Sequence, residues 1–533
     1  MRADPLAAPP AELLALVPHA YAERHAVLPL ARTATGIAVA VHVPDLAVLD
    51  DLRFVYGMPV EPVVTAEAEL RGAIVRAYDA TRSMADTMVA VEASDLGGLQ
   101  HAAEEPPDLL ETGEEAPVIR LVNALLFEAV RLGASDVHVE PAERRLAVRF
   151  RIDGVLHEVV SPSQRFQTAV AARVKIMARL DIGERRLPQD GRFTVRVGSR
   201  PLDVRVSIVP TAFGERVVLR LLDRGAAQLD VGALGLEPPH AETLGGLLEA
   251  SHGLVLVTGP TGSGKTTTLY AALARLALAE RNVMTIEDPV EYQVPRVSQM
   301  QVNPRIGLDF ASGLRAILRQ DPDVVLVGEI RDRETGEIAL QAALTGHLVL
   351  ATLHTNDAAT AVTRLLDMRL EPFLIASSLL GVLAQRLVRR NCENCAQPAA
   401  IDVHQRAWVS RYLSAPQIEK AKFHEGTGCT YCNMTGYRGR VGIYELLEVD
   451  GPIADAIRRA DLVELERLAA RAPGFVPLAE RAVSYALAGT TSLAEVMTSM
   501  AGLEEPARAS LLDDVLTSET KGAAPGGPAR VTG

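Results

Sequence analysis

The chain has 533 residues, of which 48% are hydrophobic and 23% are charged. These proportions are ordinary for globular proteins, and the length is enough for about two to four domains. The formal net charge of −13 disfavours a general nucleic-acid-binding protein, because such proteins usually carry a basic domain.

The N-terminus has no pattern of a secretory signal. Residues Met1–Pro10 lack a basic segment followed by an apolar run. The longest apolar stretches, such as Pro372–Ala384, are shorter than the ~18–20 residues of a membrane-spanning helix. We therefore expect a cytoplasmic protein whose membrane contacts are peripheral and made through a partner.

The first part of the chain predicts a small domain and a linker. Residues 1–100 read as a small α/β domain, with helices at Leu46–Val55 and Ala66–Tyr78 around short strands. Because they hold no catalytic constellation, we interpret them as a docking or packing domain. Residues 101–117 contain six acidic residues, three prolines and a glycine but no lysine or arginine, which predicts a flexible acidic linker.

Residues 118–224 predict an α+β domain. Apolar residues at helical spacing indicate a helix over Val118–Val130. Leu146–Ile152 alternates apolar residues with arginines, which is the period of a strand, and Phe193–Val197 and Leu202–Ile208 repeat that alternation. The interleaved arginines predict that this domain has a basic face.

The rest of the chain divides into four segments. Residues 225–390 alternate strand-like and helix-like segments, which is typical of an α/β domain with a largely parallel sheet. We expect a cysteine-bearing arm at 391–435, a short helical subdomain at 436–503 and a disordered tail, rich in Gly, Pro and Ala, at 504–533.

A phosphate-binding loop lies inside the α/β segment. The loop follows a short apolar run, Leu254–Thr258, and matches G-x-x-x-x-G-K-[ST]; a helix is expected over Thr266–Ala279. Its glycines let backbone N–H groups point at phosphate oxygens, and the positive end of the helix faces the same phosphates. Lys265 would reach the β- and γ-phosphates, and Thr266 would ligate Mg²⁺. The predicted nucleotide-binding residues are Gly259, Pro260, Thr261, Gly262, Ser263, Gly264, Lys265, Thr266 and Thr267.

Polar residues follow three further apolar runs of the same segment. Glu287 and Asp288 follow Val283–Ile286, and Glu329 follows Val324–Val327. Ligands of parallel sheets bind at the carboxyl ends of strands, where acids can hold Mg²⁺ or orient and deprotonate a water. His354 ends the third run and is a candidate sensor of the γ-phosphate; the alternative for these residues is helix capping or a structural histidine.

Four cysteines form two C-x-x-C pairs, Cys392 with Cys395 and Cys429 with Cys432. In a cytoplasmic chain this pattern favours a metal over disulfides, and four thiolates complete a tetrahedral Zn²⁺ site with no open position. The site is therefore predicted to be structural, with an Fe–S cluster or a redox dithiol as alternatives. The 33 residues between the pairs, Ala396–Gly428, are expected to form a helical excursion.

Together these segments resemble the type II secretion and type IV pilus assembly ATPases, and most of all the general secretion pathway E proteins. The resemblance covers roughly residues 117–500. It rests on five motifs of that family: Ser135–Pro141, Arg185–Arg192, an aspartate box at Thr285–Tyr292, a Walker B segment at Asp323–Asp332, and a histidine box from Thr345–His347 through His354–Asp357. In the Walker B segment Gly328, not an aspartate, precedes Glu329.

The resemblance implies a multidomain α/β protein. A RecA-like P-loop ATPase domain would follow a PAS-like α+β domain and the small N-terminal domain, and a tetracysteine zinc-binding subdomain would project from it. Glu287 or Glu329 would polarise the attacking water, with the choice left open. Asp288 would lie near the nucleotide and its Mg²⁺.

Arginines of the second domain would reach the nucleotide as the domains rotate. Arg205 and Arg220 occupy the matching positions, and such arginines stabilise the charge that develops during phosphoryl transfer. A surface or structural role is the alternative for each. Further candidates are Arg192, Arg216, Arg315, Arg319 and Arg331.

The implied function is a hexameric cytoplasmic motor that hydrolyses ATP, with Mg²⁺, to power type II secretion. Residues 1–100 would dock on a membrane-tethered cytoplasmic partner, and the motion would pass to an inner-membrane platform protein, with acidic phospholipid as a further contact. A type IV pilus extension ATPase would carry the same motifs. A nucleic-acid translocase, disfavoured by the acidic charge, and a non-hydrolysing nucleotide-binding scaffold are the alternatives of other classes.

Overall fold

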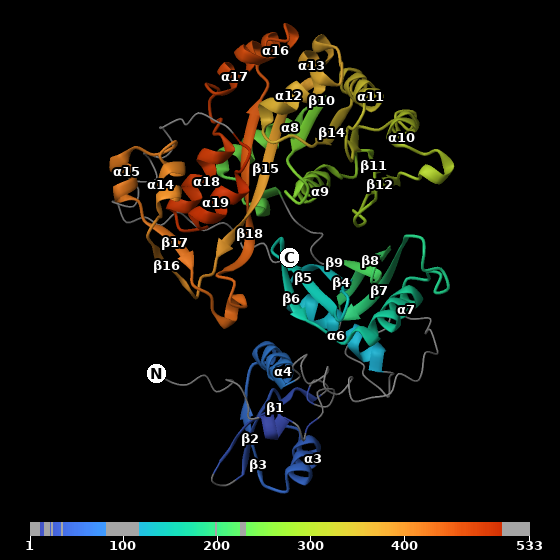
Figure 1. Ribbon diagram of the computed structural model, residues 1–533, viewed down its shortest axis with the longest axis vertical. Coiled ribbons are helices and arrows are strands. Elements are labelled where there is room, and N and C mark those ends of the chain that lie inside the picture. Colours follow the sequence, from blue (N-terminus) through green and yellow to red (C-terminus); the bar gives the residue numbers. More distant parts are fainter. Residues whose placement is uncertain are drawn as a thin grey trace.

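A computed structural model describes residues 11–14, 17, 22, 25–33, 36–81, 117–197, 200–223 and 231–503 (Figure 1). The predicted linker, apart from Pro117, and the predicted tail lie outside the described residues. Every helix in the described ranges is too short or too polar to cross a lipid bilayer.

The N-terminal domain is a small α/β unit, as its sequence predicts. Its elements are α1 (Ala11–Leu14), β1 (Val27–Arg32), β2 (Ile37–Val41), α3 (Leu46–Tyr56), β3 (Val60–Val64) and α4 (Glu67–Thr81). Strand β2 pairs antiparallel with β1 and parallel with β3. Helices α3 and α4 confirm the two predicted helices, and α4 contributes buried Leu70 and Ile74 to the core.

The second domain places two helices against one face of an antiparallel sheet. Its elements are α6 (Pro117–Arg131), β4 (Ala134–Pro141), β5 (Leu146–Ile152), β6 (Val155–Val160), α7 (Gln167–Met177), β7 (Gln189–Val197), β8 (Arg200–Thr211) and β9 (Gly214–Asp223). Across the described part of this domain the strand order is β6-β5-β4-β9-β8-β7. Val137, Phe150 and Leu219 point from the sheet into the core shared with α6 and α7. The predicted helix, strands and α+β class are therefore confirmed.

The opposite face of this sheet carries charge. Directly paired positions form one row across five strands: Arg151, Asp136, Arg220, Arg205 and Arg192. Directly opposed residues of antiparallel strands share a face, so these side chains lie on the side of the sheet away from the apolar core. The predicted basic face is this row of four arginines around one aspartate.

The third domain, which we call the large α/β domain, is built on a sheet buried on both faces. Its elements are α8 (Pro238–Glu249), β10 (Gly253–Thr258), α9 (Lys265–Leu276), β11 (Val283–Glu287), β12 (Val297–Gln301), α10 (Phe310–Ile317), β13 (Val324–Val327), α11 (Arg333–Leu344), β14 (Leu348–Leu353), α12 (Ala358–Asp367), α13 (Pro372–Ser378), β15 (Leu379–Asn391) and β18 (Tyr437–Glu448). In residues 231–503 the strand order is β12-β11-β13-β14-β10-β15-β18, and β18 alone is antiparallel to its neighbour.

Alternate residues of the central strands enter two different cores. Leu254 and Leu256 of β10 pack with the helices α10–α13 and with the C-terminal helices, whereas Val255 and Val257 pack with α8 and α9. Continuous apolar runs are required when both faces of a parallel sheet are covered. This explains why these strands have no polar alternation.

The cysteine-bearing arm interrupts the edge of this sheet. Strand β15 runs directly into Cys392, and β18 begins five residues after Cys432 (Figure 1). The arm between them contains β16 (Ala396–Ala399), α14 (Val403–Val409), α15 (Ala415–Lys420) and β17 (Phe423–Gly426). The predicted excursion is thus only partly helical, because β16 and β17 close it as an antiparallel pair.

The structure also differs from the helical subdomain expected at 436–503. Its first residues, Tyr437–Glu448, form β18 and complete the large sheet by pairing with β15. Helices α16 (Gly451–Arg458), α17 (Leu462–Ala469), α18 (Leu478–Leu487) and α19 (Leu493–Ser499) follow. Buried Glu445 of β18 accepts hydrogen bonds from the N-terminal N–H groups of Ala358 at 2.7 Å and Leu478 at 3.0 Å, which ties two helices to this strand.

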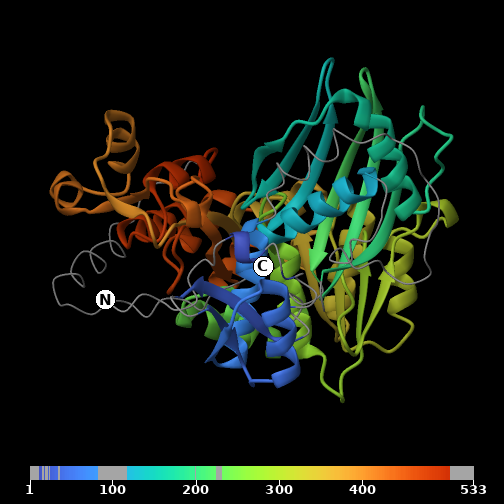
Figure 2. The ribbon, with the colours of Figure 1, turned by 90° about the horizontal axis from the view of Figure 1, so that it is seen from below.

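The second domain lies beside the large α/β domain (Figures 1 and 2), and among the described residues it contacts the aspartate box and strand β18. Arg205 Nη2 donates to Val290 O at 2.5 Å, and Arg205 Nη1 lies 2.8 Å from a carboxylate oxygen of Glu291. The turn between β5 and β6 makes the other contact, in which Asp153 accepts from the N–H of Gly439 at 2.8 Å. Both contacts join the second domain to the large α/β domain in this structure.

Candidate functional site

The glycine-rich loop connects β10 to α9, as predicted. Gly264 precedes the helix with φ of 92°, in the left-handed region that favours glycine. Lys265 begins α9, and its Nζ donates to Gly259 O at 2.7 Å and Pro260 O at 3.1 Å. Burial lowers the pKa of Lys265, and the nearby Glu329 carboxylate opposes that shift. The loop therefore surrounds a lysine ammonium beside the N-terminus of a helix.

The other loop residues differ in exposure. Thr261, Gly262 and Thr266 are exposed, Thr267 is half-buried, and Ser263 is buried. The Thr266 hydroxyl is thus accessible at the first turn of α9, where a metal bound to phosphates would meet it. Asp288 is exposed directly after β11, so its carboxylate is also free of the core.

Glu329 follows β13 at the same edge of the sheet. Its side chain is 11% exposed and forms ion pairs with Arg331 and with His354, whose Nε2 lies 3.3 Å from the carboxylate. The Glu329 charge also acts on Lys265. The structure therefore brings Lys265, Glu329 and His354 together from three strand ends.

Hydrogen bonds between strand ends hold this group. Thr352 Oγ1 of β14 donates to Gly328 O at 2.6 Å, next to Glu329. Thr258, at the end of β10, donates through Oγ1 to Leu353 O at 3.1 Å, and its Oγ1 accepts from Thr355 N at 3.0 Å. The two bonds of Thr258 hold the backbone of Leu353 and Thr355, which flank His354. The His354 side chain itself is 51% exposed.

The surroundings of Glu287 differ from those of Glu329. Its carboxylate is buried at the end of β11, where Tyr270, Thr285 and Gln299 all donate to it. The Thr285 Oγ1 and Gln299 Nε2 distances are 2.6 Å and 3.1 Å. Burial, and then the Glu287 charge, raise the pKa of Tyr270, so its hydroxyl stays a donor. Glu287 therefore accepts three hydrogen bonds in the core, whereas the charge of Glu329 acts on the loop lysine.

Two other acids of the motif segments cap helices. Asp332 accepts from Thr335 N at 2.8 Å at the start of α11, and Asp357 accepts from Thr360 N at 2.8 Å at the start of α12. A side-chain acceptor at this position satisfies an N–H group that has no partner within the helix. Capping thus falls on neighbours of Glu329 and His354 and not on these two residues.

The two predicted arginines have different partners. Arg205 reaches the large α/β domain within the aspartate box, at Val290 and Glu291. Arg220 instead bonds Asp136 of its own sheet at 2.9 Å and is 59% exposed. The conformation brings Arg205 to the edge of the site and leaves Arg220 on the second domain.

The further arginine candidates are mostly paired elsewhere. Arg331 contacts Glu329, whereas Arg315 pairs with Glu334 at 2.5 Å and Arg216 with Glu140 at 2.6 Å. Arg319 donates to Arg315 O at 2.8 Å, and Arg192 lies opposite Arg205 on β7.

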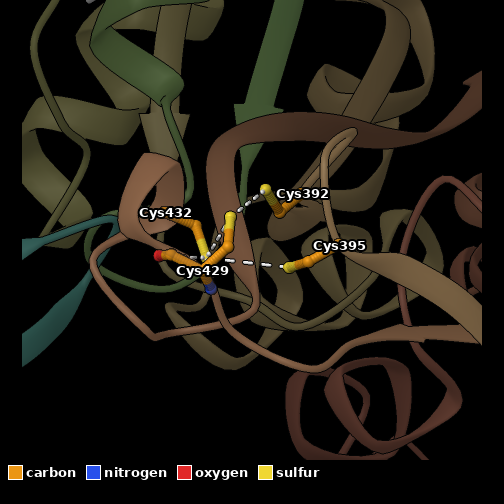
Figure 3. Close-up of side chains that lie close together, drawn as sticks. All are labelled: Cys392, Cys395, Cys429 and Cys432. Atoms are coloured by element: carbon orange, nitrogen blue, oxygen red, sulfur yellow. Dashed lines mark hydrogen bonds between the residues drawn. The ribbon is translucent and has the colours of Figure 1, made fainter.

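The four cysteines converge at the base of the arm, with their sulfurs turned toward one another (Figure 3). All four Sγ atoms lie within 4.8 Å of one another. The Sγ distances Cys392–Cys429, Cys395–Cys432 and Cys429–Cys432 are 3.7–3.8 Å. Sulfurs around one tetrahedral Zn²⁺, with Zn–S bonds of about 2.3 Å, stand about 3.8 Å apart. The cysteines are not disulfide-bonded. Their spacing fits a single ion and leaves little room for a multi-iron cluster.

Backbone groups favour a thiolate at Cys432. Burial alone would raise the pKa of this thiol. The N–H groups of Cys429 and Gly436 hydrogen-bond its sulfur at 3.2 Å and 3.3 Å, and together with the neighbouring thiols they lower its pKa to about 6. Because metals bind the thiolate form, these N–H groups make Cys432 a suitable metal ligand, whereas burial raises the pKa of the Cys392 and Cys395 thiols.

Sequence reasoning missed four polar residues that order the site: Thr258, Tyr270, Thr352 and Gln385. Each lies in an apolar helix or strand and contacts a residue that is far away in the sequence or on another strand. The only sequence signal was a polar residue inside an otherwise buried element.

Comparisons with known proteins agree with this arrangement. The family model described as Type II/IV secretion system protein matches residues 111–498, and the MshEN domain model matches residues 3–84. The type II secretion system protein HxcR of Pseudomonas aeruginosa is 48% identical over 486 residues, covering 91% of this chain and 99% of that protein. The type IV pilus assembly ATPase PilB of Myxococcus xanthus is 44% identical over 489 residues, covering 91% and 86% respectively.

A solved structure shares the fold. The Legionella pneumophila ATPase DotB superposes with a TM-score of 0.54 at 21% identity, over 75% of this chain and all of that one. The family model spans the second domain, the phosphate loop, both acidic strand ends and the four cysteines. This chain therefore belongs to the type II/IV secretion system protein family.

Proposed function

We propose that this chain is the motor ATPase of a type II secretion system, converting ATP and water to ADP and phosphate to drive pseudopilus assembly and protein export. The carrying observation is the meeting of Lys265, Glu329 and His354 at one sheet edge beside the phosphate loop. Family membership and the type II secretion relatives support this function.

The loop would bind the phosphates of ATP. Its N–H groups and the N-terminus of α9 would contact phosphate oxygens, and Lys265 would move from the loop carbonyls to the β- and γ-phosphates. Thr266 and Asp288 would hold Mg²⁺, since both side chains are exposed at this edge. A bound Mg²⁺ neutralises phosphate charge and aligns the phosphates for displacement.

Glu329 is the better candidate for orienting and deprotonating the water. It is only partly enclosed, and its neighbours Arg331 and His354 are side chains that can rearrange. Glu287 is buried and already accepts hydrogen bonds from three donors, so its carboxylate is less free to bond a water molecule. We therefore assign Glu287 to positioning, and His354 to contact with the γ-phosphate.

A phosphate-release assay on the purified full chain tests this assignment. We expect Lys265→Ala to lose ATP binding and hydrolysis. Glu329→Gln should retain ATP binding but lower kcat about 10²-fold or more, because proton transfer by a positioned base contributes that much. Glu334→Gln is the matched control, since this nearby carboxylate is exposed and pairs with Arg315. A wild-type rate in Glu329→Gln would refute the assignment of the base, and a wild-type rate in Glu287→Gln would refute the positioning role of Glu287.

Assembly and metal binding complete the proposal. The active form would be a homo-hexamer, cytoplasmic and held at the inner membrane through partners. Residues 1–100 would bind a membrane-tethered protein. The second domain, which we expect to be PAS-like, would rotate and act on a platform protein. Acidic phospholipid would be a further contact, and nucleic acid is not an expected ligand. Cys392, Cys395, Cys429 and Cys432 would hold one structural Zn²⁺, supported by their sulfur spacing.

Type IV pilus extension is the second candidate, favoured by the 44% identity to a pilus assembly ATPase. The two functions differ in their partners and not in their chemistry. Complementation of strains lacking each system's own ATPase distinguishes them. Restored export without restored piliation supports secretion, and the reverse result supports pilus extension.

A further inference from the structure

A buried glutamine joins the phosphate loop to the neighbouring strand. Gln385 lies on β15, next to β10, and is 1% exposed. Its Nε2 donates to Ser263 O at 2.6 Å, and its Oε1 accepts from Thr268 Oγ1 at 2.8 Å. One side chain therefore binds both the loop and the first turn of α9.

The first of these bonds orients a peptide unit. In a planar trans peptide the C=O of one residue and the N–H of the next point in opposite directions. Because Gln385 holds Ser263 O, the N–H of Gly264 must point away from β15. This N–H belongs to the residue just before α9, where backbone donors bind phosphate in loops of this kind.

Strand β15 packs closely against the phosphate loop, which explains why two loop positions are glycine. A Cβ at Gly259 would lie 2.4 Å from Gln385 O, and a Cβ at Gly264 would lie 2.9 Å from Gln385 Nε2. Both glycines also have positive φ, at 145° and 92°. The loop is thus shaped against the backbone and side chain of Gln385.

We propose that Gln385 is a positioning residue for nucleotide binding. Gln385 holds the Ser263–Gly264 peptide and the start of α9 so that the Gly264 N–H can bind a phosphate. This role rests on the proposed ATPase function. Thr268 completes the role because it fixes the glutamine amide so that its nitrogen faces Ser263 O.

Three substitutions separate the two bonds. Gln385→Met keeps the length of the side chain but removes both hydrogen bonds. Gln385→Glu keeps the acceptor for Thr268 but replaces the donor to Ser263. Thr268→Val removes only the hydrogen bond between Thr268 and Gln385. We expect the ADP dissociation constant to rise about tenfold in both Gln385 variants and about threefold in Thr268→Val, as for lost buried hydrogen bonds. The KM for ATP should rise similarly while kcat stays within about twofold, since these contacts act in ground and transition states alike.

The double variant Gln385→Met with Thr268→Val should bind ADP no more weakly than Gln385→Met alone, because one bridge is removed. Ser378→Ala is the matched control: Ser378 is buried just before β15 and donates to Leu374 O at 2.7 Å, far from the loop. It should leave ADP affinity unchanged.

ADP binding by calorimetry on the full-length chain, with circular dichroism to verify folding, decides the outcome. If Gln385→Met does not fold, Gln385→Glu and Thr268→Val carry the test. Folded Gln385 variants with wild-type ADP affinity and KM would overturn the positioning role. Failure of the wild-type chain to bind ADP would instead overturn the proposed ATPase function.

Discussion

The buried carboxylate of Glu287 accepts hydrogen bonds from three donors. These bonds hold the side chain in place at the end of β11. Tyr270 is central to this arrangement, because its hydroxyl donates to Glu287 and accepts from Glu291 N at 3.2 Å. Its ring also packs edge-on against Tyr292, with centroids 4.5 Å apart. Helix α9, which begins at the phosphate loop, is thus bonded to the aspartate box.

Replacing Tyr270 with Phe should lower the free energy of unfolding by about 1–3 kcal/mol, because a buried carboxylate and a buried N–H lose a partner. It should also lower kcat severalfold as Glu287 shifts. Urea unfolding and phosphate release measure the two effects. Tyr431→Phe is the control, since this ring is 42% exposed. Unchanged stability in Tyr270→Phe would contradict the bonding described for Glu287.

At the scale of elements, β15 connects two sites. Gln385 contacts the phosphate loop near the middle of this strand, and Cys392 follows its last residue. The end of the strand is held by Asn391 N to Thr490 O and by Cys392 N to Gly436 O, both at 2.9 Å. The four-cysteine cluster therefore lies where β15 ends and β18 begins.

Metal removal should first increase local unfolding at the end of β15 and the start of β18. Chelation, or Cys432→Ser, should speed amide exchange at Asn391, Cys392 and Tyr437, because bound metal stabilises only the folded arm. Exchange at Val382 and Leu447, paired within the buried sheet, should change little. Hydrogen-exchange mass spectrometry and metal analysis provide the measurement. Equal loss of protection along the whole strand, or no bound zinc in fresh protein, would count against this view.

At the scale of the molecule, the second domain touches the large α/β domain through Arg205. This arginine now pairs with Glu291, so it can reach a phosphate only if that ion pair opens. Arg220 is bonded to Asp136 and would need a larger movement of the domain. We therefore predict that hydrolysis depends on the orientation of the second domain.

Arg205→Ala should therefore lower kcat by at least about tenfold, toward the 10³-fold or greater effects of arginine fingers, with ATP affinity within about twofold. Arg220→Ala should act in the same direction. Arg145→Ala, which removes an exposed pair with Glu158, is the control and should retain the wild-type rate. Equal losses of affinity and rate in Arg205→Ala would indicate a structural role.

The parts of this protein that depend on local pattern could be predicted from the order of its residues. The glycine loop, the apolar strands before Glu287 and Glu329, and the paired C-x-x-C segments are contiguous signals, and the corresponding strands and cysteine cluster are present. Their nucleotide-binding and catalytic roles stay predictions.

The contacts between distant segments became known only from the folded chain. Nothing local to Gln385 indicates that it meets Ser263, 122 residues away, and nothing local to Tyr437–Glu448 indicates that it completes the sheet beside β15. The sequence pattern likewise treats Arg205 and Arg220 alike, although one contacts Glu291 and the other Asp136. Such pairings depend on strand order and domain orientation, which the chain reaches only when its apolar faces are buried together.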